Sequence, residues 1–199
     1  MLTNLEKKLK FVELISEMQV IKRIVYKKDD SFESDADHSW HLAMMVMTFI
    51  EDFPDLDYEK CLKFALVHDL VEVFAGDTIC FDKIAEKTKT QREKDSLELF
   101  RRDFGEILPE IISIMEEYEH KVLKEARFVY SLDKIQPIIQ TVLEGGKAWD
   151  KFKIDIDDLK QRQYSKIYPE FESLKHILDI YFERAIKEDL VYKKEIGQR

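Results

Sequence analysis

The stretch FALVHDLVEVFAGD, residues 64–77, decides the fold class of this chain and points to its chemistry. Its apolar residues recur at helical spacing, and His68 and Asp69 stand side by side in the middle of the run. A buried imidazole and a buried carboxylate must each find a partner. A divalent metal ion satisfies both, because His and Asp are donors that Zn²⁺, Mn²⁺ and Co²⁺ share. The dipeptide therefore predicts a metal-binding helix in a helical protein.

Helical spacing continues on both sides of this stretch. The pattern predicts helices over residues 5–23, 38–52, 57–74, 91–104, 109–118, 123–143 and 169–188. Asp35 or Asp37 is expected to cap the second of them, and Pro137 to interrupt the sixth. Residues 26–35 and 77–89 are expected to be loops, and the segment from Gly145 to Tyr168 to be looser. With five glycines and four prolines there is little material for an all-β fold, so we predict an all-α helical bundle.

Length and composition limit the classes of function. The 199 residues suffice for one sizeable core, and no linker or repeat divides them, so we expect a single domain over residues 1–199. The net charge of −9 argues against a nucleic-acid polymer or an anionic membrane as partner. Cys61 and Cys80 are too few for a disulfide framework, which fits a reducing cytosol. The N-terminus has a helical period rather than that of a signal peptide, and no run reaches the length of a membrane span, so we expect a cytoplasmic protein.

Two further donors in the chain could converge on the same ion. His38 stands at the start of the preceding helix, and Asp133 lies between apolar residues in SLDKIQPI. Helical bundles build metal sites in this way, with donors projecting from several helices into the core. The alternative is a set of core histidines and surface aspartates without common purpose. The combination favours one metal site of His38, His68, Asp69 and Asp133, with Glu72 one turn beyond His68 on the same side of the helix.

These motifs resemble a known family. The series SFESDADHSWHLAMMV (31–46), ALVHDLVEVFAGD, EYE (117–119), EARFVYSLDK (125–134) and GGKAW (145–149) is similar to the HD-domain metal-dependent phosphohydrolases, in the branch that contains the bacterial 5′-deoxynucleotidases. The resemblance covers residues 23–149, the motif core, and the C-terminal helix 169–188 is expected to pack on that core. It implies one divalent cation, Mn²⁺, Co²⁺, Fe²⁺, Ni²⁺ or Zn²⁺, held by the four donors named above.

The resemblance also implies roles for neighbouring residues. Glu72 and Asp77 match acidic residues beside the metal, and carboxylates there can receive or deliver a proton. Arg23 matches an arginine that binds the substrate phosphate, as suits a guanidinium group. Glu33, in the loop before His38, is a candidate for ordering that loop or contacting substrate.

The chain also departs from the family pattern at two positions. Ile24 stands where the nucleotidases carry a tryptophan implicated in reading the sugar, and Ser31 replaces an arginine found in relatives. No preference for deoxyribose is therefore implied.

Three functions remain open at this stage. The first is hydrolysis of nucleoside 5′-monophosphates or similar small phosphates, with a metal-activated water attacking the phosphate. The second is hydrolysis of nucleoside triphosphates or of an alarmone, although no cluster of basic residues for additional phosphates stands near the motifs. The third is a metal- and nucleotide-binding protein without turnover. The expected partner is a small phosphorylated substrate, and relatives lead us to expect a homodimer.

Overall fold

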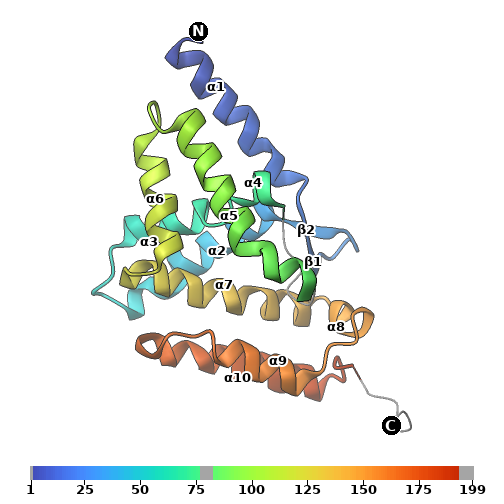
Figure 1. Ribbon diagram of the computed structural model, residues 1–199. Coiled ribbons are helices and arrows are strands. Elements are labelled where there is room, and N and C mark those ends of the chain that lie inside the picture. The colour runs from blue at the N-terminus through green and yellow to red at the C-terminus, as the bar shows by residue number, and fades with distance from the viewer. Residues whose placement is uncertain (1, 77–82, 193–199) are drawn as a thin grey trace. The chain divides into compact units, whose positions relative to one another are not determined.

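The structure, a computed structural model, describes the backbone of residues 2–76 and 83–192 (Figure 1). Helices form most of it, which confirms the all-α class. The α-helices are α1 (Asn4–Ile15), α2 (Asp35–Phe49), α3 (Tyr58–Val67), α4 (Glu72–Ala75), α5 (Lys83–Phe104), α6 (Pro109–His120), α7 (Lys124–Leu143), α8 (Lys147–Lys151), α9 (Ile156–Tyr164) and α10 (Lys175–Lys187). The 3-10 helices are η1 (Ser16–Gln19), η2 (Ile50–Asp52) and η3 (Pro169–Leu174), and the strands β1 (Lys22–Tyr26) and β2 (Phe32–Ser34) pair with each other.

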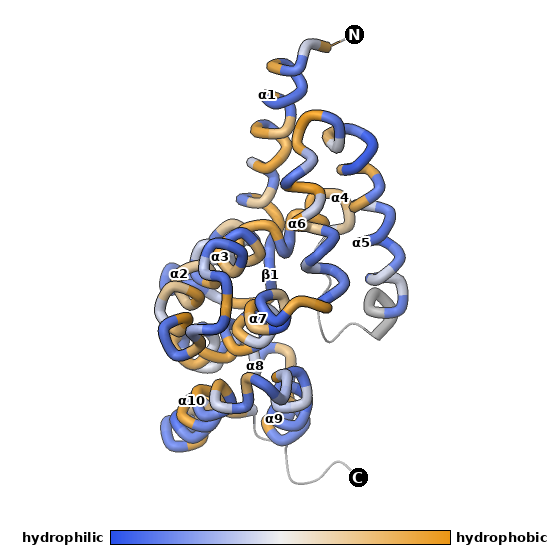
Figure 2. The backbone as a smooth tube through the Cα atoms, turned by 90° about the vertical axis from the view of Figure 1, so that its left-hand side faces the viewer, coloured by the Kyte–Doolittle hydropathy of each residue, from blue (hydrophilic) through white to orange (hydrophobic). Residues whose placement is uncertain are grey.

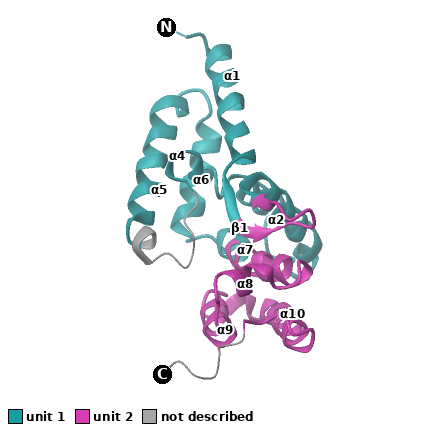
Figure 3. Cartoon of the chain, turned by 90° about the vertical axis from the view of Figure 1, so that its right-hand side faces the viewer, with its two compact units in different colours: residues 1–23, 34–129 teal, residues 24–33, 130–199 magenta. Residues whose placement is uncertain are grey.

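The chain divides into two compact units, which Figure 3 distinguishes by colour. The first contains residues 1–23 and 34–129, and the second contains residues 24–33 and 130–199. Each unit is described by itself below. The single domain expected over residues 1–199 stays a prediction.

Residues at the N-terminal ends of α1 and α2 explain where these helices begin. Thr3 caps α1, and its hydroxyl accepts a hydrogen bond from the backbone N–H of Glu6. Ser34 caps α2 in the same way, since its hydroxyl accepts from the backbone N–H of Asp37, and the Asp37 carboxylate accepts from the backbone N–H of Ser34. Both helices therefore start with a complete capping box. Figure 2 shows apolar and polar residues alternating along α1, as expected of a helix with one buried face.

The packing of α2 against α3 forms one part of the core of the first unit. Leu42 and Val46 of α2 and Cys61, Phe64 and Ala65 of α3 are all fully buried. Burial of such side chains contributes about 1.5–3 kcal/mol for each large residue. The two helices therefore form a rigid pair. His38 lies near the start of α2, and His68 lies at the end of α3.

A second cluster of the same unit joins α1, α5 and α6. Phe11 of α1 meets Phe100 and Phe104 of α5 edge-on, with ring centroids 6.4 and 5.3 Å apart. Leu70 and Val71 enter this cluster from the turn that follows α3. The turn is thus anchored in the core through two apolar side chains, which fixes the backbone beside the His68-Asp69 dipeptide.

The second unit has its own core, in which aliphatic side chains surround a group of stacked aromatic rings. Phe182 of α10 stacks with Trp149 of α8 and with Tyr164 of α9, at centroid distances of 6.3 and 6.2 Å. Gly146 starts α8 with φ = +73°, and a Cβ built there would lie 2.1 Å from the carbonyl oxygen of Leu190. A larger residue at this position is therefore excluded by both backbone and contact.

The structure corrects several expected boundaries. The helix expected over residues 5–23 ends at Gln19, and β1 and β2 take up parts of that helix and of the loop expected over residues 26–35. The loop expected over residues 77–89 is wrong from Lys83 onward, because α5 begins there. Residues 145–168 contain α8 and α9, and Ser34 rather than either aspartate is the N-cap of α2. Pro137 lies inside α7 without ending it.

The correction that matters most concerns the helix expected over residues 57–74. It is divided into α3 and the single turn α4, with residues 68–71 forming a turn between them.

None of the described helices is long and apolar enough to cross a membrane.

Candidate metal centre

The His68-Asp69 dipeptide occupies the break between α3 and α4. The backbone N–H of His68 still donates to the carbonyl of Phe64 at 3.0 Å, as in an α-helix. Leu70 and Glu72 instead donate to carbonyls three residues back, at 3.0 and 2.9 Å. Neighbouring side chains on an unbroken α-helix point about 100° apart. The change to a tighter turn lets two consecutive residues present their donors to the same point.

Three donor atoms come together at this break. Nε2 of His68 lies 3.0 Å and Nε2 of His38 lies 3.8 Å from Oδ2 of Asp69. Ligand atoms from all three residues lie within 4.8 Å of one another. With metal–ligand bonds of about 2.0–2.2 Å, donors on one ion stand roughly 3–4 Å apart. The spacing of the three donors fits a single divalent cation.

The orientation of the His68 ring supplies an independent test of that fit. Its Nδ1 lies 2.9 Å from the carbonyl oxygen of Ala65. A carbonyl oxygen can only accept, so Nδ1 carries a proton, and Nε2 is the nitrogen that faces Asp69. The rings of Tyr118 and His38 pack against the same imidazole, at 5.8 and 5.1 Å between centroids. Such fixing of the far nitrogen is the usual support of a metal-binding histidine.

The electrostatics of Asp69 also suit a cation ligand. Burial alone would raise its pKa, but His68, Arg23 and His38 outweigh burial and hold the pKa well below its usual range. The carboxylate is therefore charged throughout the physiological range. An anionic oxygen between two imidazoles is a donor set for Zn²⁺ and for the other transition metals named above.

A second acidic group adjoins the first. Carboxylate oxygens of Asp35, Asp69 and Glu72 lie within 4.8 Å of one another, and the side chains of Asp35 and Glu72 are buried. Sequence reasoning considered Asp35 only as a helix cap. Its spacing of three residues from His38, on the same side of α2, was the signal that could have placed it in the site.

Two cations face these carboxylates. Nη1 of Arg23 lies 2.9 Å from Oδ2 of Asp69 and 3.7 Å from Oδ1 of Asp35. Nζ of Lys89 lies 3.5 Å from Oε1 of Glu72. Arg23 was expected near the metal, and in the structure it lies beside Asp69, one of the predicted ligands. Lys89 was missed, because its segment was expected to be a loop.

Three predicted residues lie outside the part of the first unit that the structure describes. Asp133 and Glu33 belong to the second unit, where Asp133 pairs with Lys134 at 2.6 Å and Glu33 accepts a hydrogen bond from Gln136 at 2.7 Å. Asp77 lies outside the described residues. The roles expected for these three stay predictions.

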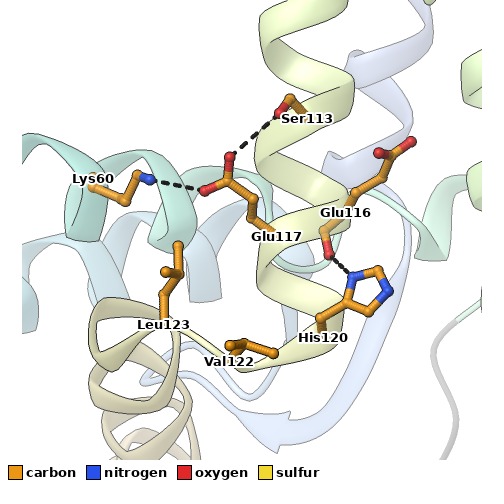
Figure 4. A pocket seen from close by; sticks show the side chains of 7 residues that line it. All are labelled: Lys60, Ser113, Glu116, Glu117, His120, Val122 and Leu123. Carbon is orange, nitrogen blue, oxygen red and sulfur yellow. Dashed lines mark hydrogen bonds and ion pairs between the residues drawn. The ribbon is translucent and has the colours of Figure 1, made fainter.

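The first unit also has an open hollow of about 520 Å³ that contains none of these residues (Figure 4). Lys60 and Glu117 form an ion pair across it at 2.8 Å, and Ser113 donates to the same glutamate at 3.3 Å. His120 contacts the carbonyl of Glu116 at 2.6 Å. The polar groups of the hollow are engaged with one another, and we assign it no chemistry.

Comparison with known proteins gives concordant results. The HD domain family matches residues 15–175. Proteins named 5′-deoxynucleotidase HDDC2 align with about two thirds of this chain: 32% identical over 137 residues in Xenopus laevis, 36% over 135 in Danio rerio and 33% over 135 in Homo sapiens. These alignments span 67%, 66% and 65% of the relatives' own lengths.

A solved structure shares the fold. The crystal structure of a predicted metal-dependent phosphohydrolase from Magnetospirillum magnetotacticum superposes with a TM-score of 0.76 and 24% identity. The match covers 96% of this chain and 99% of that one.

Proposed function

Because this chain belongs to the HD domain family, we propose that it is a metal-dependent phosphohydrolase that removes the phosphate group of nucleoside 5′-monophosphates. The relatives named 5′-deoxynucleotidase support this substrate class. The observation that carries the proposal is the His68 ring, whose Nδ1 is engaged by Ala65 while its Nε2 stands 3.0 Å from Asp69. Such an arrangement supports the assignment of His68 as a metal ligand.

The proposed ligand set is His38, His68, Asp69 and Asp133, the last on the basis of the sequence alone. When bound, a divalent cation polarises the phosphoryl group and lowers the pKa of a water molecule. The donor set suits Mn²⁺, Co²⁺, Fe²⁺, Ni²⁺ or Zn²⁺.

The remaining steps belong to side chains of the protein. The Arg23 guanidinium binds phosphate oxygens, and Glu33 is proposed to contact the substrate or to order the segment that does so. The Glu72 carboxylate accepts the proton of the attacking water as its oxygen bonds to phosphorus. The bond from phosphorus to the 5′-oxygen breaks, and Asp77 delivers a proton to that oxygen. Nucleoside and inorganic phosphate are the products.

Phosphate release from a panel of nucleotides tests this function. The purified protein is stripped of metal, reloaded with each of the five cations in turn, and mixed with nucleoside mono-, di- and triphosphates. We expect release from monophosphates only, and no release from the stripped protein. Pyrophosphate or triphosphate as a product would instead establish the second activity considered above. Nucleotide binding without any release would establish a non-catalytic protein.

The sugar is expected to contribute little to recognition. With Ile24 at the position of the relatives' tryptophan, ribo- and deoxyribonucleotides should be hydrolysed within about tenfold of each other, or roughly 1.4 kcal/mol of transition-state binding. The ratio of kcat/KM for a matched pair of nucleotides measures this directly.

We also propose that the protein is a cytoplasmic homodimer. A free and fully buried Cys61 fits a reducing compartment. Exposed apolar side chains at helical spacing on α1 (Leu5, Leu9 and Val12) offer a surface for a second copy. The molar mass of the purified protein, measured by light scattering at several concentrations, tests the dimer. The mass of a monomer at all concentrations would contradict it.

A further inference from the structure

Lys89 of α5 reaches the acidic side of the metal centre. Its Nζ lies 3.5 Å from Glu72 and 3.2 Å from Glu93. The Glu72 side chain is 4% exposed and the lysine side chain 37%, so the ammonium group stands between a buried carboxylate and solvent. A pair with Glu93 on the same helix would be an ordinary surface interaction. The contact with Glu72, on a different helix, joins the lysine to the site.

The position of Lys89 is fixed by its own helix. One turn further along α5, Arg92 donates to the backbone carbonyls of Ala75 and Gly76. After another turn, Ser96 donates to the carbonyl of Val71 at 2.5 Å. Positions 89, 92 and 96 share one face of a helix. Figures 1 and 3 show α5 beside α4 in the first unit. The helix therefore holds the very segment that carries Glu72, and Lys89 extends the same row of contacts.

The charges of the site give this lysine a purpose. Three carboxylates, those of Asp35, Asp69 and Glu72, gather around the donor atoms. A phosphate monoester carries a charge of nearly −2 at neutral pH and cannot approach them without cationic partners. Arg23 is already engaged by two of the carboxylates and is only 15% exposed. Lys89 is the more accessible of the two cations, with three N–H donors on a flexible stem.

We propose that Lys89 binds the phosphate group of the substrate as a second cationic contact beside Arg23. Its ammonium group contacts Glu72 in this structure and donates to a phosphate oxygen when substrate binds. The inference rests on the proposed phosphohydrolase function and extends it, because it makes Lys89 a residue that selects for a phosphate dianion.

Calorimetric titration of the metal-loaded protein with inorganic phosphate tests the proposal without turnover. Lys89→Met and Lys89→Gln should each weaken phosphate binding about tenfold or more, equivalent to roughly 1.4 kcal/mol, and raise KM for a nucleoside monophosphate by a similar factor. Lys89→Arg should restore most of the binding. Lys94→Met is the matched control, since Lys94 lies on the same helix but is exposed, and it should behave as the wild type.

Metal content and thermal unfolding of each variant establish that the site is intact. Phosphate binding as tight in both neutral variants as in the wild type would overturn the proposal, even if kcat fell, because Lys89 would then act only by positioning Glu72. Failure of the metal-loaded wild type to bind phosphate would overturn it as well. A wild type that binds phosphate but hydrolyses no nucleotide would refute the proposed function alone, and the comparison of variants would still decide the role of Lys89.

Discussion

Replacing Arg23 by methionine should destabilise the metal-free protein far more than the loss of an ordinary surface charge. The guanidinium lies 2.9 Å from Asp69, and the two side chains are 15% and 14% exposed. Removing one partner of a buried ion pair costs about 3–5 kcal/mol, because the other charge stays buried. Asp69 keeps His68 at 3.0 Å, so we expect the lower end, about 3 kcal/mol.

Urea unfolding with and without metal measures this effect. With a dependence of about 2 kcal/mol per molar urea, the midpoint of the metal-free variant should fall by roughly 1.5 M. A bound divalent cation supplies positive charge to the same carboxylate and stabilises the folded state by mass action. The shift caused by Arg23→Met should therefore be smaller in the metal-loaded protein.

Arg101→Met is the control for this experiment. Arg101 pairs with Glu98 and Glu116 but is 46% exposed, so solvent screens these pairs and its loss should lower the midpoint much less. If Arg23→Met lowered the metal-free midpoint no more than this control, Arg23 would not neutralise the buried carboxylates. An equal shift with and without metal would show that the cation does not bind at Asp69.

Three further outcomes are expected. Glu72→Gln should keep its metal but lose kcat by about a hundredfold or more, the scale of a missing general acid or base, and a kcat near that of the wild type would make Glu72 a bystander. His68→Ala and Asp69→Ala should each lose the cation in elemental analysis and with it all phosphatase activity, and full occupancy in both would remove these residues from the ligand set. Because the pKa of Asp69 is lowered in the folded protein, its charge contributes stability above an unfolded pKa of about 4, and this contribution is lost as pH falls toward the folded pKa. Unfolding free energies of the metal-free wild type should consequently fall more steeply between about pH 5 and pH 3 than those of Asp69→Asn.

Periodicity predicted the helices well where one face is apolar, and poorly where tertiary contacts decide. The polar segment before Gln91 has no apolar repeat, yet α5 begins at Lys83, because Arg92 and Ser96 tie this helix to neighbouring backbone. The strands were missed because β1 has only five residues and β2 three, too short for an alternating pattern to stand out.

The candidate site was predicted in part. His68 and Asp69 were predicted because polar donors in an apolar run need partners. His38 was predicted from its place at the start of a helix and Glu72 from its spacing to His68, and all four lie in one unit. Lys89 carried no such signal, since a lysine in a charged segment reads as a solvated residue. Only the contact between α5 and α4 reveals it.

Amide hydrogen exchange in the turn between α3 and α4 should measure the affinity of the site for a metal ion. The amide groups of Leu70 and Glu72 in this turn donate hydrogen bonds to carbonyls three residues back. Their hydrogens exchange with solvent only when these hydrogen bonds open. A cation held by the adjacent side chains opposes that opening in proportion to its free concentration over its dissociation constant. Deuterium uptake across residues 68–73 should thus record metal affinity in the absence of any substrate, and would rank the candidate cations before a single turnover is measured.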